Sequence, residues 1–277
     1  MIPLIFGSEN KARCIEELKK LRPYVVFRKV TKPAAVLIPL CIVRNVPAIM
    51  FLRRSMRLRT HPGEIGFPGG KCDPHDDGDM IRTALRETQE EIGIDPESVD
   101  IWYQLPRMDG RSSLYPILGF CGHVTVPEDE ATLTTFRNIS APLGSAERPH
   151  QLRLNVGEVS YAFFRSVDWL CDVNNLAHTD MRARSVYSFQ STEHRLRNSD
   201  PPKPDSLPHH FRYVLPAYGN LAHTGSPGPR IWGLTAIMTY RVLHCLIPHG
   251  GPYSPNLPMT KLLDPLITGR IANSDEL

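Results

Sequence analysis

The spacing of apolar and polar residues along the chain predicts helices alternating with strands. A helical spacing of apolar residues runs from Ser8 to Leu21. Two apolar runs, 34–43 and 48–52, follow at a separation typical of a β-hairpin. Three more strands are expected, at 101–105, 115–124 and 161–167. A last helix is expected after Trp232, and the alternation as a whole indicates a mixed sheet between helices.

The middle of the chain predicts a loop followed by an amphipathic helix. Residues 53–68 read as a loop because prolines and glycines interrupt them. The helix is expected over about 79–92 and should end at Gly93, a typical C-terminal cap. Its apolar stripe should face the core and its glutamates a cleft; the stripe is Met80, Ala84, Leu85 and Ile92.

Three glutamates of this helix are candidates for binding a metal ion. Glu87, Glu90 and Glu91 stand at i, i+3 and i+4, which places them on one face of a helix. Like charges at that spacing oppose helix formation, and a hard divalent cation would compensate them. A solvated acidic face, with Arg86 paired to Glu90, is the alternative interpretation.

Residues 69–94, GGKCDPHDDGDMIRTALRETQEEIGI, resemble the Nudix box, G-x5-E-x7-R-E-U-x-E-E-x-G-U, in which U is apolar. The interval from Gly70 to Arg86 is two residues longer than in the general box. Asp76 replaces the first glutamate, and Thr88 stands at a position that is usually apolar. A longer loop with an aspartate is similar to the coenzyme A diphosphatase branch of that superfamily.

Two further segments carry the resemblance to this branch. Residues 54–70, RSMRLRTHPGEIGFPGG, match a signature of the form R-S-x3-R-x3-G-x3-F-P-G-G, and 230–236 resemble an IWG-x-TA segment. Met50-Phe51-Leu52 replaces the Leu-Leu-Thr that usually precedes the signature. The resemblance covers roughly residues 30–247 and is strongest to the animal mitochondrial members, whose box similarly runs PGGKCDP and LRET.

The resemblance implies an α/β fold, the Nudix fold, with a mixed sheet between helices (α/β/α). We expect an N-terminal helical segment over 1–29, a Nudix domain over 30–250 and a C-terminal tail over 251–277. Proline-rich or loop-like insertions are expected at 134–156 and 197–212, either as a lid or dimer surface or as loops without function.

The implied activity is hydrolysis of the diphosphate of coenzyme A or acyl-coenzyme A. The products would be 4′-phosphopantetheine, free or acylated, and adenosine 3′,5′-bisphosphate. Two alternatives are a Nudix diphosphatase of another nucleotide, such as NADH or ADP-ribose, and a Nudix module that binds without catalysis. Intact glutamates at 87, 90 and 91 oppose the last alternative.

Each candidate site residue has an expected role. Glu87, Glu90, Glu91 and the Gly70 carbonyl would hold Mg²⁺ or Mn²⁺, because these cations prefer oxygen ligands. Arg86 would orient the site by pairing with Asp76 or another box carboxylate, and the general base is either a box glutamate or Glu158. Coenzyme A carries a 3′-phosphate, so basic and hydroxyl side chains of the upstream signature would contact it: Arg54, Ser55, Arg59 and His61.

Composition narrows the class of protein further. A net charge of +3 does not favour nucleic acid as a partner, while the local run of Arg53, Arg54, Arg57 and Arg59 suits a small polyanion. The six cysteines contain no C-x-x-C pair, so neither a zinc site nor a disulfide framework is expected. Cys41, Cys121 and Cys171 lie in apolar runs and should be buried.

The sequence says less about the cellular location and the oligomeric state of the protein. No run approaches the roughly eighteen apolar residues that span a membrane. The first fifteen residues make a poor secretory signal, and the last four lack the basic residue of a retention tail. Reduced thiols fit an intracellular location, and the resemblance favours the mitochondrion. A monomer and a homodimer are both compatible with the sequence.

Overall fold

The computed structural model describes residues 4–25, 33–109, 113–125, 152–172, 174–185, 188–191, 211–219 and 229–248. Its helices are α1 (Ser8–Lys20), α2 (Met80–Ile92), α3 (Val167–Cys171) and α4 (Gly233–Leu246), with short 3₁₀ helices η1 (Leu4–Phe6), η2 (Pro74–Asp76) and η3 (Pro96–Ser98). The first nine strands are β1 (Tyr24–Val25), β2 (Ala34–Val43), β3 (Val46–Arg54), β4 (Ile65–Gly66), β5 (Gly69–Lys71), β6 (Asp100–Gln104), β7 (Met108–Asp109), β8 (Ser113–Val124) and β9 (Val159–Ser166). The remaining three are β10 (Leu176–Ser185), β11 (Ser188–Ser191) and β12 (Phe211–Tyr218).

The central sheet is mixed, with the order β1-β7-β8-β2-β3-β4. Outside this path, β5 pairs with β2, β6 with β8, and β9 with β3. β2 runs parallel to β8 and antiparallel to β3. The β2–β3 hairpin is confirmed, and its turn residues Arg44 and Asn45 have φ of 48° and 64°, as a type I′ turn requires. The expected loop over 53–68 holds the end of β3 and the short strand β4.

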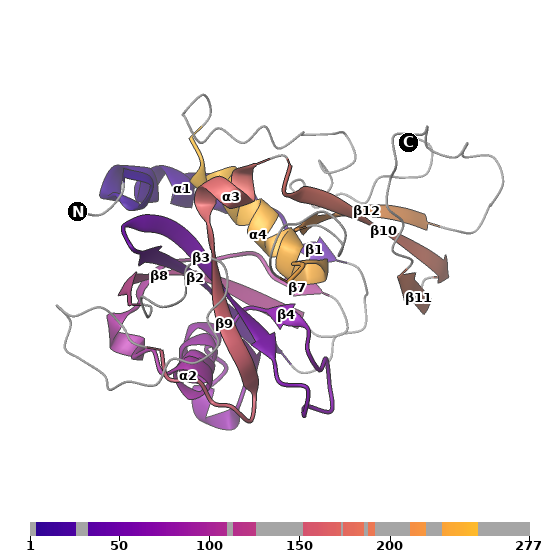
Figure 1. Ribbon diagram of the computed structural model, residues 1–277, viewed down its shortest axis with the longest axis horizontal. Coiled ribbons are helices and arrows are strands. Elements are labelled where there is room, and N and C mark those ends of the chain that lie inside the picture. The colour runs from indigo at the N-terminus through magenta and orange to yellow at the C-terminus, as the bar shows by residue number, and fades with distance from the viewer. Residues whose placement is uncertain are drawn as a thin grey trace.

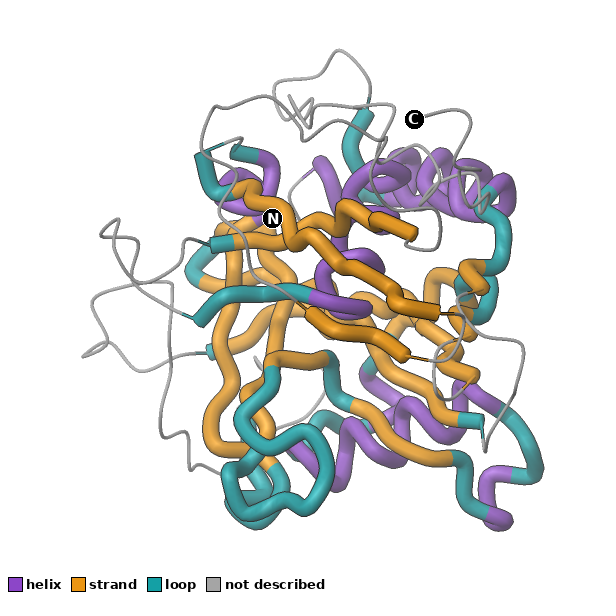
Figure 2. The backbone as a smooth tube through the Cα atoms, turned by 90° about the vertical axis from the view of Figure 1, so that its right-hand side faces the viewer, coloured by secondary structure: helices purple, strands orange, loops and turns teal. Residues whose placement is uncertain are grey.

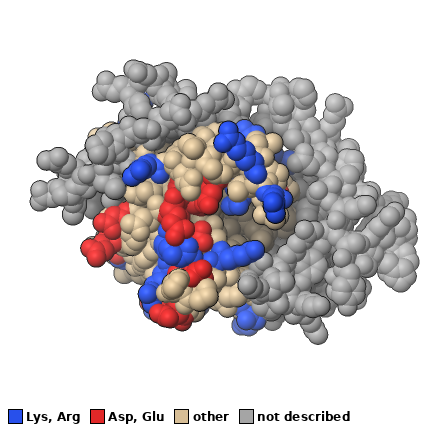
Figure 3. All heavy atoms as spheres, turned by 90° about the horizontal axis from the view of Figure 1, so that it is seen from below, with Lys and Arg blue, Asp and Glu red and all other residues tan. Residues whose placement is uncertain are grey.

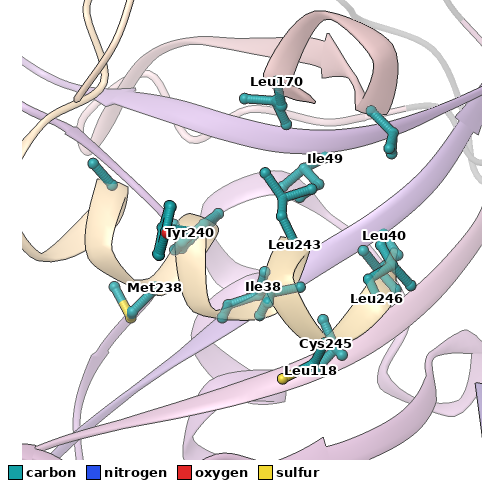
Figure 4. Close-up of a cluster of buried hydrophobic side chains, with 14 of the residues drawn as sticks. Ile38, Leu40, Ile49, Leu118, Leu170, Met238, Tyr240, Leu243, Cys245 and Leu246 are labelled. Atoms are coloured by element: carbon teal, nitrogen blue, oxygen red, sulfur yellow. The ribbon is translucent and has the colours of Figure 1, made fainter. Parts of the chain in front are cut away.

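Helices cover both faces of this sheet, as expected from the sequence. α2 lies on one face, and α1, α3 and α4 lie on the other (Figure 1). Each face of the sheet has its own hydrophobic core, and alternate residues of β2 point into one or the other. Leu37 packs on the α2 side, and Ile38 and Leu40 pack on the α4 side. Figure 4 shows the second core, in which α4 side chains meet those of the strands and of α3.

The first and last helices of the described chain are joined directly. Asn10 Nδ2 donates to the Leu246 carbonyl at 3.0 Å, and Arg13 Nη2 donates to the Cys245 and Leu246 carbonyls at 2.8 and 2.7 Å. These carbonyls have no partner inside the helix, so α1 caps the end of α4. The helix expected from Ser8 begins at that residue, and Gly7 holds the N-cap position.

A second sheet was not predicted. Its order is β11-β10-β12, with both pairings antiparallel, and β12 packs against α4. Figure 2 views the molecule from the side of these strands, with helices above and below the sheets. The expected insertion at 197–212 ends inside β12, and its residues 197–210 lie outside the described chain, as do residues 134–151 of the other insertion.

The cysteine side chains are free thiols, as expected. Cys41 and Cys121 are buried, and so are Cys14 and Cys245, whereas Cys171 is only partly buried. Burial raises the pKa of Cys14 and of Cys245 to about 12, so these thiols remain protonated at neutral pH. None of the described helices is long and apolar enough to cross a membrane.

Candidate functional site

A buried ion pair fixes the loop that precedes α2. Asp76 is 3% exposed, and its Oδ2 accepts from the Asp73 backbone N–H at 2.8 Å. Arg86 Nε lies 3.0 Å from Oδ1, and Nη2 lies 3.0 Å from Oδ2. This guanidinium holds the pKa of Asp76 well below its ordinary value. The bidentate pair expected from the sequence is present, and it ties the loop to the helix.

Glu87 lies against the glycine pair at the start of the box. A Cβ atom at position 70 would lie 2.5 Å from the Glu87 Cδ and Oε2 atoms, so only glycine leaves room for this carboxylate. Arg86 Nη1 is 3.1 Å from Glu87 Oε1. Burial raises the pKa of Glu87, and the neighbouring guanidinium opposes that rise. Glu87 and the Gly70 backbone are therefore neighbours, as a shared oxygen site requires.

Glu91 is the most buried of the three glutamates, at 5% exposed. Its Oε2 accepts from the Gly69 N–H at 3.0 Å, and its Oε1 is 3.9 Å from Arg54 Nη1. Burial raises the pKa of Glu91 to about 7, because the hydrogen bond from Gly69 and the charge of Arg54 do not compensate for the loss of hydration. A carboxylate in this position favours a cation beside it.

Glu90 alone fits the alternative of a solvated acidic face. Its side chain is 54% exposed and pairs with Arg86 Nη1 at 3.3 Å, the i, i+4 pair expected under that interpretation. In the part of the chain that the structure describes, no three His, Cys, Asp or Glu side chains converge closely enough to form a metal-binding group. A cation would therefore combine these carboxylates with backbone and substrate oxygens, which is the usual mode of Mg²⁺.

The loop before β9 is fastened to the C-terminal end of α2. Arg153 N donates to the Ile92 carbonyl at 2.8 Å, and Asn155 N donates to the Glu91 carbonyl at 2.9 Å. The Glu158 N–H then donates to the Asn155 carbonyl at 3.0 Å. Burial is the main cause of the raised pKa of Glu87 and of Glu91, and the charge of Glu158 adds to it, so the candidate base lies in the neighbourhood of these two glutamates.

The upstream signature forms a loop on the other side of Glu158. Ser55 N donates to the Glu158 carbonyl at 2.7 Å, and the buried Ser55 hydroxyl accepts from Arg57 N at 3.3 Å. Among the expected substrate contacts, the structure brings Arg54 to the glutamates. Arg59 is exposed on the loop, and His61, also exposed, pairs with Glu64 at 2.8 Å.

The face that carries these residues mixes both signs of charge. Figure 3, which views the molecule from below Figure 1, shows acidic side chains gathered in a band with Lys and Arg side chains beside and between them. A hollow in the surface adjoins the band, and Lys and Arg side chains stand at its rim. Such a surface can bind a polyanion together with its counter-cation.

Sequence reasoning missed the residues that support this arrangement. Thr83 Oγ1 donates to Asp76 Oδ2 at 2.9 Å, and Asn155 Oδ1 accepts from Gly157 N at 3.1 Å. The Asn155-Val156-Gly157 sequence contained a signal for the second bond, because asparagine often bonds the backbone two residues ahead in a turn. Nothing local indicated that Thr83 faces the aspartate.

Comparison with known protein families agrees with this geometry. The family model described as the NUDIX domain matches residues 32–182, which include the box, the upstream signature and Glu158. The chain belongs to the NUDIX domain family. The expected α/β Nudix fold, a mixed sheet with helices on both faces, is thereby confirmed.

Three relatives within this family extend the likeness over most of the chain. Mitochondrial coenzyme A diphosphatase NUDT8 of Mus musculus is 33% identical over 95% of this chain and 99% of its own. The protein of the same description from Homo sapiens is 33% identical over 93% and 86%. Nudix hydrolase 3 of Caenorhabditis elegans is 28% identical over 88% and 87%.

Proposed function

We propose that this NUDIX protein is a metal-dependent hydrolase that cleaves the diphosphate of coenzyme A or acyl-coenzyme A. Its products would be 4′-phosphopantetheine, free or acylated, and adenosine 3′,5′-bisphosphate. The observation that carries the proposal is the buried Glu91 carboxylate, held between the Gly69 N–H and Arg54 and next to Glu87. Two relatives described as coenzyme A diphosphatases support the choice of substrate.

The donor set fits Mg²⁺ or Mn²⁺. Glu87, Glu90, Glu91 and the Gly70 carbonyl would hold the ion, and all of these donors are the hard oxygens that such cations prefer. Burial of Glu91 and Glu87 supports the assignment, since a buried carboxylate needs a compensating cation. When bound, the cation neutralises charge on the phosphoryl oxygens and lowers the pKa of water.

Side chains of the protein would bind the diphosphate, accept the proton of the attacking water and hold the box loop in position. Arg54 would contact the diphosphate oxygens, since its guanidinium reaches Glu91 from the end of β3. Glu158 or a box glutamate would take the proton of the attacking water. Arg86 would act through Asp76, by holding the box loop in register with α2. Ser55 accepts one backbone bond and can still donate its hydroxyl proton to a ligand.

Arg59 and His61 would contact the outer part of the substrate. Both are exposed on the signature loop. Coenzyme A carries a 3′-phosphate beyond its diphosphate, and exposed basic side chains suit a phosphate that stays in contact with water. Small-molecule recognition of this kind requires neither nucleic acid nor a membrane.

The proposal is tested by hydrolysis of coenzyme A, NADH and ADP-ribose with Mg²⁺ or Mn²⁺, with products separated by chromatography. The wild-type chain should release adenosine 3′,5′-bisphosphate from coenzyme A, and Glu90→Gln should lose at least about 100-fold in kcat. Glu90 is exposed, so this variant should keep its fold. Glu16→Gln is the matched control, because Glu16 is an exposed helical glutamate paired with Lys19. Turnover of NADH or ADP-ribose alone would reject coenzyme A as substrate.

A mitochondrial location belongs to the same proposal. It rests on the mouse and human relatives, both described as mitochondrial. Cell fractionation of the full chain with a C-terminal tag would test it. Recovery with a mitochondrial matrix marker is the expected result, and recovery with another compartment would contradict it.

A further inference from the structure

Segment 230–236, which carries part of the resemblance to coenzyme A diphosphatases, forms the start of α4. Ile231 pairs with Tyr218 of β12 in an isolated bridge. Gly233 has a φ of 65°, a backbone conformation that favours glycine, and it begins the helix. Thr235 follows in the first turn and is only 8% exposed. The segment therefore places a buried hydroxyl group at the N-terminal end of α4.

The Thr235 hydroxyl is bonded to the backbone of β4. Its Oγ1 donates to the Ile65 carbonyl at 3.1 Å, although the two residues are 170 positions apart in the chain. On the side that faces β3, Arg54 N donates to the Glu64 carbonyl at 3.0 Å. The adjoining Arg53–Ile65 pair is then of the non-hydrogen-bonded kind, so the Ile65 carbonyl points away from β3. Thr235 therefore bonds the outer edge of β4, and β4 ends the strand order of the described sheet.

β4 is a short strand, so each bond to it matters. It contains two residues, Ile65 and Gly66, which pair with Arg53 and Leu52 of β3. The Ile65 side chain is half-buried and packs against the core on the α4 side of the sheet. Gly66 has no side chain to anchor it. With the Thr235 bond in place, β4 is held by β3 on one edge and by α4 on the other.

β4 closes the loop that carries the expected substrate contacts. This loop runs from Ser55 to Glu64 and includes the exposed Arg59 and His61. His61 Nδ1 lies 2.8 Å from Glu64 Oε2, and the Glu64 carbonyl bonds to the backbone of Arg54. The backbone of Arg54 and the end of the loop are therefore joined just before β4, and movement of β4 would displace both.

The chain on the other side of β4 has anchors of its own. Phe67 is buried and stacks on Phe51 at a centroid distance of 5.1 Å. Leu37 N donates to the Pro68 carbonyl at 2.9 Å. Pro68 immediately precedes the glycine pair of the box, whose first N–H donates to Glu91. The contact with this candidate metal ligand should therefore survive a loosening of β4 that displaces the loop.

We propose that Thr235 is a positioning residue for substrate binding, because its hydroxyl holds β4 and thereby the loop that receives the phosphates of the substrate. The inference rests on the proposed function. Thr235 acts through the Ile65 backbone, whereas the glutamates belong to α2, which the Arg86–Asp76 pair ties to its preceding loop. Loss of the hydroxyl should therefore weaken substrate binding and leave the turnover of bound substrate nearly unchanged.

The test measures coenzyme A hydrolysis by two variants at this position. Thr235→Val removes the hydroxyl but keeps the branched shape, and should raise KM about three- to tenfold with kcat changed less than about twofold. Thr235→Ser keeps the hydroxyl and should hold KM within about twofold of the wild-type value. Thr239→Val is the matched control, because Thr239 is buried one turn further along α4 and its hydroxyl donates to the Thr235 carbonyl at 2.8 Å. It should lower the melting temperature without raising KM.

Hydrogen exchange of the full chain without substrate provides a readout that is independent of turnover. Thr235→Val should speed amide exchange in the segment 55–66, whereas Thr235→Ser and Thr239→Val should leave that segment at the wild-type rate. Faster exchange throughout the chain would show that the hydroxyl only stabilises the fold, and would overturn the positioning role. A KM that rises equally in Thr239→Val, or that Thr235→Ser fails to restore, would overturn it as well.

The remaining outcomes separate the positioning role from the function on which it rests. If the wild type hydrolyses coenzyme A, an unchanged KM in Thr235→Val overturns the positioning role alone. A fall in kcat at constant KM also overturns it, because the hydroxyl would then act on the glutamates. If the wild type hydrolyses only NADH or ADP-ribose, the proposed function fails, and the change in KM for that nucleotide decides the positioning role. No turnover of any of the three compounds would reject both.

Discussion

At the scale of single residues, two neighbouring aspartates should differ in their contribution to stability because one is buried and the other is exposed. Asp76 and Asp77 each pair with an arginine of α2, but their side chains are 4% and 76% exposed. Asp76→Asn should lower the free energy of unfolding by about 1.5–3 kcal/mol at pH 7, because it weakens charged hydrogen bonds in a buried site. Asp77→Asn is the control and should cost less than about 1 kcal/mol. Urea denaturation measures both values.

The lowered pKa of Asp76 gives this loss a pH dependence. In the folded protein the pKa lies below its unfolded value of about 3.9, so the ionised carboxylate stabilises the fold above that pH. The contribution is lost as the pH falls through the folded pKa. The stability difference between wild type and Asp76→Asn should therefore shrink from about pH 5 downward. A constant difference would show that charge is not its source.

A substitution at a single residue, Glu158, also tests which side chain is the general base. If Glu158 accepts the proton of the attacking water, Glu158→Gln should lower kcat for coenzyme A by about 10²–10⁴-fold, with little change in KM. Its backbone bonds to Ser55 and Asn155 do not involve the side chain, so the loops should stay in place. Glu97→Gln, at an exposed glutamate of η3, is the control. A normal rate across the pH range would assign the base to a box glutamate instead.

At the scale of secondary-structure elements, local signals determined what the sequence could predict. The apolar spacing and the Gly93 C-terminal cap located α2, and the separation of two apolar runs located the β2–β3 hairpin. β10 could not be predicted because its sequence, LAHTDMRARS, lacks sustained apolar alternation. Its strand form depends on pairing with β12, whose residues lie 28 to 42 positions later in the chain. The burial of Glu91 could not be predicted either, because its side-chain contacts, Gly69 and Arg54, are distant in the sequence.

The junction between α2 and the Glu158 loop leads to a prediction at this scale. Gly93 ends α2 with a φ of 74°, and a Cβ atom there would lie 2.9 Å from the Arg153 Cβ. Gly93→Ala should therefore strain the backbone and also displace the loop that contains Arg153. Both effects should lower the melting temperature, and the displaced loop should lower kcat. Gly122→Ala is the control: its φ is 69°, but no atom lies within 4 Å of the added Cβ. It should cost only the strain of about 1–2 kcal/mol and keep kcat.

At the scale of the whole molecule, the first helix belongs to the same core as the last. Ile5, Phe6, Cys14, Leu18 and Leu21 are buried in one cluster with α4 and with the sheet face opposite α2. Burying each such side chain contributes about 1.5–3 kcal/mol, so together they contribute roughly 7–15 kcal/mol as an upper estimate. The total stability of a domain is about 5–15 kcal/mol. The N-terminal segment is therefore expected to be indispensable to the domain that follows it.

Deleting residues 1–21 tests this expectation. The shortened chain should lose its cooperative thermal transition or aggregate, because the deletion uncovers the apolar surface of α4 and removes the Arg13 bonds to its last carbonyls. Single substitutions refine the test: Leu18→Ala should cost about 2–5 kcal/mol, whereas Lys19→Ala, one residue along on the exposed face, should change little. Cooperative unfolding of the shortened chain at the wild-type temperature would instead mean that the NUDIX domain folds without α1. The first helix would then be an appendage of the domain, and its contacts with α4 would contribute little to stability.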